Sequence, residues 1–546
     1  MGGVVTRVSS GELTSVEQSL VERVGCGKLL DLVAEGEAVD ATAMRSWGKS
    51  RAVRASVLRD ILRGRLAADP DPHGVRLRGA RIIGRLDLEN LTTDVSLKLV
   101  VCLLEEGVVA RDARLAALSL EGCQLEHPAE PPLDGARLTC SVLSLNSARV
   151  IGHAKVGAVR LAGARIGGSL DCSAAELRNG SGPALDADNL QVDQHMYLDG
   201  GFTATGSGGD GAVRLLGAHI GGQLSCSGAK LHNGSGPALQ AEGLQVGQNM
   251  FLRGGFTATG SGDKGAVRLA DAHIGGQLSC SGAKLHNGSG PALDADSLQV
   301  GQHMFLADGF TATGGGKAVA VNLAGARVGG AFFFASAQLK HTADSHRRLA
   351  VDGLTYAGLP QYISPQDWRN LLRDGTHAYA AQPYQQLAAA YRALGDDRQA
   401  RQTLMAQRDD QLARTQPRWP EKVWGQITKV TLGYGYQPWR ALWFLAAVVI
   451  VSCVLAVVLG AHGALAQTDK TAALGRPCTV TQQVSVGLDL NLPVGTSVAR
   501  AGCDLTKDSA SVTAAWLTAV GWVLRLLAWV FAALFIAGFT SAVRKT

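Results

Sequence analysis

The feature that most constrains the fold of this chain is an internal repeat with a period of 54 residues. It fills most of the segment from Ile151 to Leu339, where Cys172, Cys226 and Cys280 follow one another at the same interval. The copies share the pattern Gly-Ala-Val-Arg-Leu and begin at Gly157, Gly211 and Gly265, with a divergent copy at Val319. A period of this length indicates a solenoid or an array, in which each unit packs mainly against its neighbours.

Each unit divides into two related halves of about 24 to 30 residues, because the pattern of segment 163–172 recurs in a modified form in segment 187–198. Apolar residues alternate with polar ones, as in Leu170-Asp171-Cys172, and glycine, asparagine, aspartate and serine separate these short runs. Alternation at a period of two predicts strands rather than helices. Short strands cannot bury an apolar face alone, so each half is predicted to be one coil of a β-solenoid.

A β-propeller is the competing architecture, but its blades need four longer strands with an aromatic signature. Aromatic residues make up only 5% of this chain, whereas glycine is abundant at 68 residues. We therefore predict a mainly β protein built on a β-solenoid (β-helix). Related motifs extend the solenoid to residues 71–345, which corresponds to about ten coils and a rod roughly 50 Å long.

Residues 1–70 are predicted to form a helical cap over the first coil, which would otherwise expose its strand edges. The sequence from Thr14 to Glu17 matches a capping box at a helix start. Five arginines form a basic surface on this cap: Arg51, Arg54, Arg59, Arg63 and Arg65. This surface could bind an anionic partner, or it could simply be the solvated face of the cap. The whole chain has a net charge of only +6, so nucleic acid is not the expected partner.

Residues 351–430 change character and are predicted to form a helical adaptor. The segment 383–405 has the pattern of a helical hairpin, with Ala388 and Ala400 small enough for the helices to approach closely. It resembles one tetratricopeptide unit, which could bind a peptide. The alternative interpretation, which we favour, is a packing adaptor between the solenoid and the membrane.

Residues 438–546 are predicted to form a transmembrane hairpin of two helices. Ala441 to Ala461 contains no charged residue over 21 positions, and Ala514 to Val543 is interrupted only by Arg525. Each segment is long enough to cross about 30 Å of hydrocarbon. The loop 463–512 between them is predicted to lie outside the cytoplasm. The protein is therefore expected to be an integral membrane protein with two spans.

The distribution of basic residues predicts the orientation of this hairpin. Lys422, Lys429 and Arg440 precede the first span, Arg544 and Lys545 follow the second, and the charges in the loop are balanced. By the positive-inside rule both termini and the solenoid are cytoplasmic. The first twenty residues contain no continuous apolar segment, so no signal peptide is expected.

Three features of the membrane region suggest specific roles. Cys478 and Cys503 lie in the loop that should face an oxidising compartment, so we expect a disulfide between them, with pairing to a partner protein as the alternative. Arg525 is an intramembrane charge, which by default suggests a helix contact or an ion path. It lies about one-third of the way along its span, so it could instead extend to the headgroups.

No motif in the sequence identifies catalysis, and the catalytic residues remain unknown. Cys172, Cys226 and Cys280 would be ~9 to 10 Å apart on alternate coils, too far for a disulfide or a shared metal. The segment Gly206 to Gly211 resembles a dinucleotide fingerprint, but a strand rather than a helix follows it, so we reject that interpretation. We predict neither a cofactor site nor a metal site.

The chain nevertheless resembles a group of bacterial membrane proteins with two spans and a β-solenoid distantly similar to pentapeptide-repeat proteins. The resemblance rests on the Gly-Ala-Arg-Ile-Gly-Gly coils, on Tyr434-Gly-Tyr-Gln-Pro-Trp-Arg-Ala-Leu442 and on Leu488-Asp-Leu-Asn-Leu-Pro493. Members of this group often carry the label membrane-associated oxidoreductase. The resemblance implies location in the cell inner membrane and redox activity, but it supplies no catalytic residues for this chain.

Three functions follow as hypotheses. The first is a scaffold or interaction module, a cytoplasmic solenoid that is held at the membrane and presents its surface to a protein partner. The second is a membrane-associated oxidoreductase with an unidentified cofactor, as the resemblance implies. The third is a channel or transport component in which several hairpins assemble as a homo-oligomer, with Arg525 and the segment 489–493 along the path.

Overall fold

The structure is a computed structural model that describes residues 13–37, 39–67, 69–335, 338–415, 418–462, 465–467, 477–489, 491, 503–505 and 511–545. The chain divides into two compact units, Met1–Ala400 and Arg401–Thr546. The first unit contains the solenoid and the second contains the two long apolar helices.

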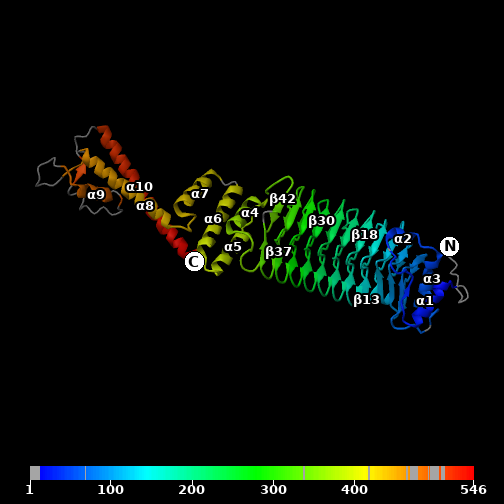
Figure 1. The fold of residues 1–546 in the computed structure, drawn as a ribbon. Helices are drawn as coiled ribbons and strands as arrows, with labels where there is room; N and C mark the ends of the chain where they lie inside the picture. The colour runs from blue at the N-terminus through cyan, green and yellow to red at the C-terminus, as the bar shows by residue number, and fades with distance from the viewer. Residues whose placement is uncertain are drawn as a thin grey trace. The chain divides into compact units, whose positions relative to one another are not determined.

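The first unit confirms the predicted β-solenoid, with about eleven coils rather than ten (Figure 1). Its strands form three long sheets, which we call sheets A, B and C. Every strand pair in them is parallel, as between Leu170 and Met196 on successive coils. Sheet C has one strand in each coil. Its eleven strands are β5 (Leu86–Asp87), β9 (Val108–Val109), β12 (Leu133–Asp134), β15 (Val159–Arg160), β19 (Leu185–Asp186), β23 (Val213–Arg214), β27 (Leu239–Gln240), β31 (Val267–Arg268), β35 (Leu293–Asp294), β39 (Val321–Asn322) and β43 (Leu349–Ala350).

Sheet B also has one strand in each coil. Its twelve strands are β2 (Ala52–Arg54), β4 (Arg81–Ile83), β8 (Leu103–Leu104), β11 (Gln124–Glu126), β14 (Arg149–Gly152), β18 (Glu176–Asn179), β22 (Thr203–Gly206), β26 (Lys230–Asn233), β30 (Thr257–Gly260), β34 (Lys284–Asn287), β38 (Thr311–Gly314) and β42 (Leu339–His341).

Sheet A has two short strands in most coils. Its twenty strands are β1 (Leu30–Asp31), β3 (Val75–Arg78), β6 (Thr92–Thr93), β7 (Leu97–Val100), β10 (Arg114–Glu121), β13 (Thr139–Ser144), β16 (Arg165–Ile166), β17 (Leu170–Asp171), β20 (Gln191–Val192), β21 (Met196–Tyr197), β24 (His219–Ile220), β25 (Leu224–Ser225), β28 (Gln245–Val246), β29 (Met250–Phe251), β32 (His273–Ile274), β33 (Leu278–Ser279), β36 (Gln299–Val300), β37 (Met304–Leu306), β40 (Arg327–Val328) and β41 (Phe332–Phe334).

The 54-residue period corresponds to two coils of slightly different length. Leu170 pairs with Met196 after 26 residues, and Met196 pairs with Leu224 after 28 residues. The steps in sheet B are all 27 residues there, as from Glu176 to Thr203. The longer coil therefore carries its additional residues at the corners on either side of sheet B, where they do not disturb the strand register.

The core explains why the repeat contains two coils. At one inward position alanine and phenylalanine alternate from coil to coil, so that Ala229 lies between Phe202 and Phe256, and all three are fully buried. Two residues further along, the order of sizes is reversed, because Ala204 and Ala258 flank Leu231. A large side chain in one coil thus packs against a small one in the next, which fills the interior without overpacking.

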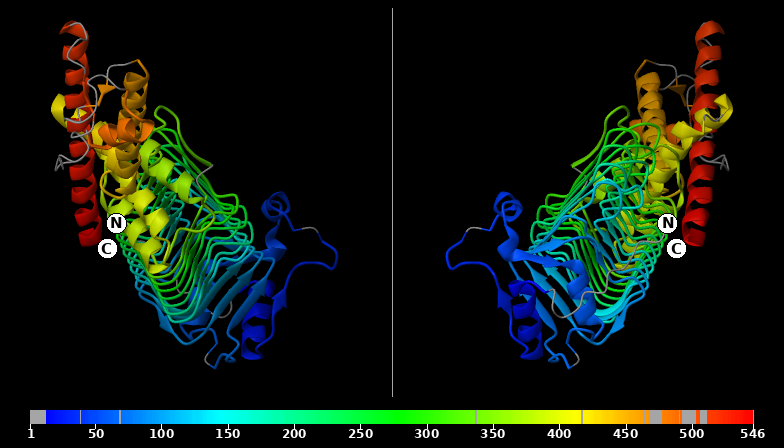
Figure 2. Two further views of the ribbon diagram at one scale, coloured as in Figure 1. Left: turned by 90° about the vertical axis from the view of Figure 1, so that its left-hand side faces the viewer. Right: turned by 90° about the vertical axis from the view of Figure 1, so that its right-hand side faces the viewer.

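The first coils are covered by short helices and strands, coloured blue in Figure 2. Helices α1 (Ser15–Gly25), α2 (Ala41–Arg45) and α3 (Ala55–Leu62) and the 3₁₀ turn Lys49–Arg51 lie in this region. Helix α3 places Val57, Leu58 and Ile61 in the core. The predicted capping box of α1 is confirmed, since the Thr14 hydroxyl accepts from the Glu17 amide at 3.3 Å and Glu17 accepts from the Thr14 amide at 2.9 Å.

The last coils are covered by helices α4 (Pro365–Asp374) and α5 (Gln382–Ala393). The side chain of Trp368 on α4 is almost fully buried and packs edge-on against Phe334, with ring centroids 5.4 Å apart. Phe332 and Phe334 point into the core, whereas Phe333 between them faces outward. The end of the solenoid is therefore covered by an aromatic cluster to which α4 contributes.

Helix α6 (Asp397–Arg414) connects the two units. The second unit then contains α7 (Trp419–Leu432), α8 (Trp439–Ala461), α9 (Val480–Asp489) and α10 (Ser511–Lys545), together with the small antiparallel pair β44 (Leu465–Ala466) and β45 (Asp504–Leu505). Among the described residues, two segments are long and apolar enough to cross a membrane, Trp439–Ala461 and Ala519–Thr540. Helix α9 was not anticipated from the sequence.

Candidate functional site

The outer face of sheet C carries a ladder of alternating charges that stabilises the stacking of the coils. Arg268 lies 3.0 Å from Glu242 on the preceding coil and 3.4 Å from Asp294 on the following one. The same position in earlier coils is occupied alternately by arginine and by an acidic or amide residue, at Arg160, Asp186, Arg214 and Gln240. If every coil had the same sequence, identical charges would lie ~4.8 Å apart on neighbouring strands and repel one another. These charges therefore neutralise one another within the solenoid.

The histidines at the recurring position His195 and His303 also have structural partners. The Nδ1 atom of His195 accepts from the Gln223 amide at 3.1 Å, and Asn249 accepts from the Gln277 amide through Oδ1 at 3.0 Å. Histidine and asparagine alternate here because both offer an acceptor at the same place. The exchange of histidine for asparagine thus preserves a hydrogen bond between coils.

The outer face of sheet B differs from β22 onward, because its cations have no acidic neighbour on the adjacent strands of that sheet. The sheet B strands from β22 to β42 contain no aspartate or glutamate. From β22 to β38 their outward positions alternate between two threonines in one coil and a lysine with a histidine in the next, and β42 places Lys340 beside Thr313. The cationic or ionisable side chains are Lys230, His232, Lys284, His286 and Lys340, and all are exposed. Equivalent cations on alternate coils are spaced ~9.6 Å apart.

Two of these side chains, Lys230 and His232, line an open groove over sheet B. The groove has a volume of about 510 Å³ around Lys230 and His232, and the hydroxyls of Thr203, Thr257 and Thr259 contribute to its walls. At its N-terminal end Glu176 forms an ion pair with Arg178. Beyond that pair, Lys230 and Lys284 form no ion pair with any residue that the structure describes. We call the outward residues of β26, β30, β34, β38 and β42 the cationic face.

The five arginines predicted as a basic surface lie around the first coils, where carboxylates meet four of them. Arg51 binds Glu37 through two hydrogen bonds of 2.9 and 2.6 Å, and Arg65 lies 3.3 Å from Asp60. Arg59 forms an ion pair with Asp87, and Arg54 binds the fully buried Glu17. Arg63 is exposed. Glu17, Glu37 and Asp87 lie outside the segment 51–65 and offset part of its positive charge.

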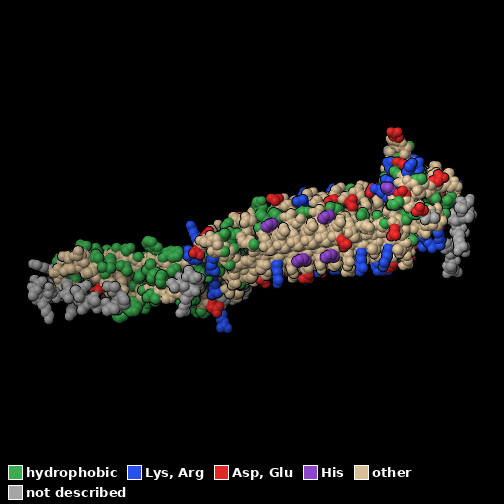
Figure 3. Space-filling view, turned by 90° about the horizontal axis from the view of Figure 1, so that it is seen from below, with side chains coloured by type: hydrophobic (Ala, Val, Ile, Leu, Met, Phe, Trp, Pro, Cys, Tyr) green, Lys and Arg blue, Asp and Glu red, His purple; other side chains and the backbone are tan. Residues whose placement is uncertain are grey.

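The second unit has an apolar surface over its two long helices. In Figure 3 hydrophobic side chains gather over α8 and α10, whereas the visible face of the solenoid carries scattered charges and histidines. Only 11% of the most apolar window of α8 and 6% of that of α10 are buried within the protein. Such a surface needs a nonpolar solvent, which a bilayer provides.

Helix α7 has a second apolar face just before the first of these helices. Trp419 is 76% exposed and Trp424 60% exposed, and Val423, Ile427 and Val430 continue the same side of the helix. Lys422 and Lys429 belong to the same helix, and Lys429 lies 3.0 Å from Asp409. Tryptophan and lysine beside an apolar face are typical of a helix at a membrane–water interface.

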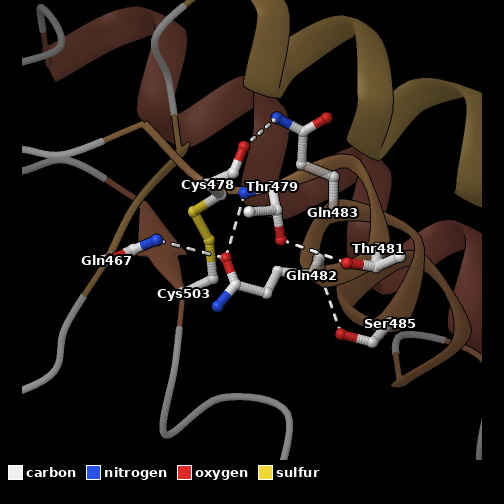
Figure 4. Close-up of a disulfide and its surroundings, with 8 residues drawn as sticks. All are labelled: Gln467, Cys478, Thr479, Thr481, Gln482, Gln483, Ser485 and Cys503. Carbon is white, nitrogen blue, oxygen red and sulfur yellow. Dashed lines mark hydrogen bonds between the residues drawn. A yellow bond between two sulfur atoms is a disulfide. The ribbon is translucent and has the colours of Figure 1, made fainter.

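Cys478 and Cys503 are joined by a disulfide, with their Cα atoms 6.4 Å apart (Figure 4). The bond lies at the start of α9, next to the strand pair of β44 and β45, and both sulfur atoms are buried against Leu465. The Gln483 side chain donates to the Cys478 carbonyl at 3.0 Å. The disulfide therefore fixes the first turn of α9 relative to β45.

The other eight cysteines are free thiols. Cys172, Cys226 and Cys280 are fully buried in the solenoid core, where burial raises the pKa of Cys280 to about 12. Such thiols stay protonated and act as small core side chains. Cys26 is exposed. Among the residues that the structure describes, no group of three or more histidine, cysteine or carboxylate side chains could hold a metal ion.

Arg525 lies on α10 and is half-buried. It forms no hydrogen bond or ion pair with any of the described residues. Asp489, at the end of α9, is likewise half-buried and without an ion-pair partner in that part of the chain. Both residues belong to the path hypothesised from the sequence, Asp489 as the first residue of the segment 489–493.

Comparisons with models of protein families, with curated protein sequences and with solved structures found no match for this chain. The resemblance to bacterial proteins labelled as membrane-associated oxidoreductases therefore gains no support from them. The case for function depends on the cationic face and on the second unit.

Proposed function

We propose that this protein is a membrane-anchored interaction module whose solenoid binds an acidic segment of a partner protein along the cationic face. The observation that carries this proposal is the row of lysine and histidine side chains on β26, β34 and β42 with no acidic residue on the intervening strands. In the arginine ladder on sheet C, the opposing carboxylates lie within the solenoid. On the cationic face a partner has to supply them.

The geometry of this face suits an extended ligand. Lysine ammonium groups and threonine hydroxyls are both hydrogen-bond donors to carboxylates, and they alternate along the cationic face at Thr257, Lys284 and Thr311. A flat ladder of parallel strands offers these donors in a straight line over several coils. An acidic polypeptide segment can therefore contact several lysines at once, which increases affinity by linking individually weak contacts.

The anchor is formed by α8 and α10, with α7 at the interface. We infer that the solenoid is cytoplasmic and that the loop of Cys478 and Cys503 lies on the opposite side of the cell inner membrane. A disulfide in that loop together with free thiols elsewhere supports this orientation, since disulfides persist in oxidising compartments.

Thiol labelling tests the orientation. In sealed spheroplasts, a membrane-impermeant maleimide should label Cys26 only after permeabilisation, because this exposed thiol would lie in the cytoplasm. A Val480→Cys variant, at an exposed position beside the loop, should be labelled without permeabilisation. Labelling of Cys26 in intact spheroplasts would contradict the orientation.

Binding of an acidic peptide tests the proposed function. We expect the detergent-purified full chain to bind a fluorescent polyglutamate peptide of about 20 residues, with an affinity that falls at least tenfold between 50 and 500 mM salt. The variant Lys230→Ser/Lys284→Ser should bind at least tenfold more weakly, because two unpaired charges are removed from the cationic face. Fluorescence anisotropy measures both effects.

The matched control is Arg165→Ser/Arg327→Ser, which removes two exposed charges from sheet A instead of sheet B. This variant should bind the peptide as the unmodified protein does. Equal losses of peptide affinity in both variants would show that only the net charge matters and would contradict specific binding to the cationic face. Tighter binding of a single-stranded oligonucleotide than of the peptide would replace the protein partner by a nucleic acid.

A further inference from the structure

Helix α9 packs closely along one stripe of α8. The buried residues Ser452, Ala456 and Gly460 are each four positions apart and therefore lie on one side of α8. A Cβ atom on Gly487 of α9 would lie 2.6 Å from the Cα of Cys453, and one on Gly460 would lie 2.2 Å from the Gln483 side chain. Glycines on both helices thus permit an approach that larger residues would prevent.

This contact places the end of α9 at the middle of α8. The Asn491 Oδ1 atom lies 3.3 Å from the Ser452 hydroxyl, and the Asn491 amide group donates to the Gly487 carbonyl at 2.8 Å. Ser452 lies nine residues before the end of α8 at Ala461, a distance of about 14 Å along the helix. If α8 crosses the bilayer, as proposed above, Asn491 lies near the centre of about 30 Å of hydrocarbon. Helix α9 is then a re-entrant half-helix.

Lipid alone cannot cover such a segment. A helix ends with carbonyl groups that lack partners within the helix, and its C-terminus carries a partial negative charge. Asp489 adds a carboxylate to the same end of α9. Non-helical backbone and charges occur at this depth only where they are buried in protein or line a water-filled cavity.

Arg525 lies at a similar depth on α10. The rings of Phe444 and Phe531 stack with centroids 5.4 Å apart, and Gly538 faces Pro438 near the start of α8. These two contacts define an antiparallel register in which Arg525 is about level with Ile450. Each chain therefore has one basic and one acidic group near the middle of the membrane, and the two form no ion pair with each other.

We propose that copies of this chain assemble in the membrane and that Asp489 of one copy forms an ion pair with Arg525 of the next. A second copy is the occupant that the structure favours, because it supplies the complementary charge at the required depth. Pairing between two different surface positions generates a ring when the rotation closes. This inference rests on the proposed membrane anchoring, and it adds an assembly contact that the anchoring does not require.

A charge exchange tests the contact. The full chain and the variants Asp489→Arg, Arg525→Asp and Asp489→Arg/Arg525→Asp would be reconstituted in nanodiscs large enough for several copies, and subunits would be counted by single-molecule photobleaching. We expect oligomers for the unmodified chain, at least a tenfold loss of oligomers for each single variant, and recovery in the double variant. Recovery distinguishes an ion pair from general misfolding.

The control Val480→Arg adds a charge at the exposed start of α9, away from the contact, and should leave the subunit count unchanged. Alkaline carbonate extraction of the membranes separates the two proposals. Release of the unmodified chain by carbonate would contradict the anchoring itself. A chain that resists extraction but is monomeric, or single variants that remain oligomeric, or a double variant that does not recover, would overturn the assembly contact and leave the anchoring intact.

Discussion

Replacing Phe256 by alanine should destabilise the centre of the solenoid by about 3 to 5 kcal/mol. The Phe256 side chain is fully buried, and the neighbouring coils place Ala229 and Ala283 at the same inward position. These small neighbours cannot fill the cavity, so the cost includes both lost burial and a persistent void. Hydrogen exchange of the detergent-purified full chain, followed by mass spectrometry, measures the change. Amides of β26, β30 and β34 should exchange more than about 100-fold faster.

The matched control is Phe251→Ala, five positions earlier on the same coil. Phe251 points outward and is half-buried, with the Arg253 guanidinium 4.1 Å from its ring centre. Its removal leaves no internal cavity, so exchange in the three sheet B strands should change by less than about tenfold. Equal effects of the two substitutions would contradict the assignment of Phe256 to a tightly packed core.

Replacing Glu17 by glutamine should weaken the attachment of α1 to the first coils by about 2 to 3 kcal/mol. One Glu17 oxygen accepts from the Arg54 amide at 3.0 Å and from Arg54 Nε at 2.9 Å, and the other accepts from Arg54 Nη2 at 2.7 Å. In glutamine an NH2 group would replace one of these oxygens, and it would face the N–H donors of Arg54 without being able to accept from them. Faster hydrogen exchange of α1 and β2 would report the loss, and Glu22→Gln on the exposed side of the same helix should have no such effect.

The same carboxylate predicts how this attachment depends on pH. Burial alone would raise the pKa of Glu17, but hydrogen bonds from Arg54 and from the Thr14 amide outweigh it and hold the pKa at about 2. Because the folded pKa lies below that of an unfolded glutamate, the stabilisation is complete above about pH 4.5 and disappears as the pH falls toward 2. Exchange of α1 should accelerate in this range in the unmodified protein and remain flat in Glu17→Gln. A flat profile in both would contradict the role of the carboxylate.

Much of the fold could be predicted from the sequence, because units that repeat at a fixed interval have to pack against one another. Alternating apolar residues such as Leu170 and Cys172 are sufficient to specify short strands, and strands that recur at a fixed interval have to stack. The two long apolar segments could also be recognised directly in the sequence, since length and hydropathy alone decide whether a helix can span a bilayer. The capping box at Thr14 is a local motif and needs no distant partner.

The candidate sites were less accessible to sequence reasoning. The alternation of Thr-Ala-Thr-Gly with Lys-Leu-His-Asn is visible between Thr203 and Asn287, but the sequence does not say which of these residues face outward beside one another. Strand pairing decides that, because it places Lys230 between Thr203 and Thr257. The arginines near the N-terminus show the opposite case, since Glu17 and Asp87, which pair with Arg54 and Arg59, lie 37 and 28 residues away along the chain.

The sequence by itself determined the class of fold, the two-coil repeat and the two apolar helices, because each depends on periodicity or composition along the chain. Only the tertiary structure decided which charges are neutralised, how α4 covers the last coils, and that α9 returns along α8 to the level of Ser452. These features depend on contacts between residues far apart in the sequence, whose side chains carry no local pattern. The same physical reason explains why the sequence could include Asp489 in a hypothetical path but could not give its depth relative to α8.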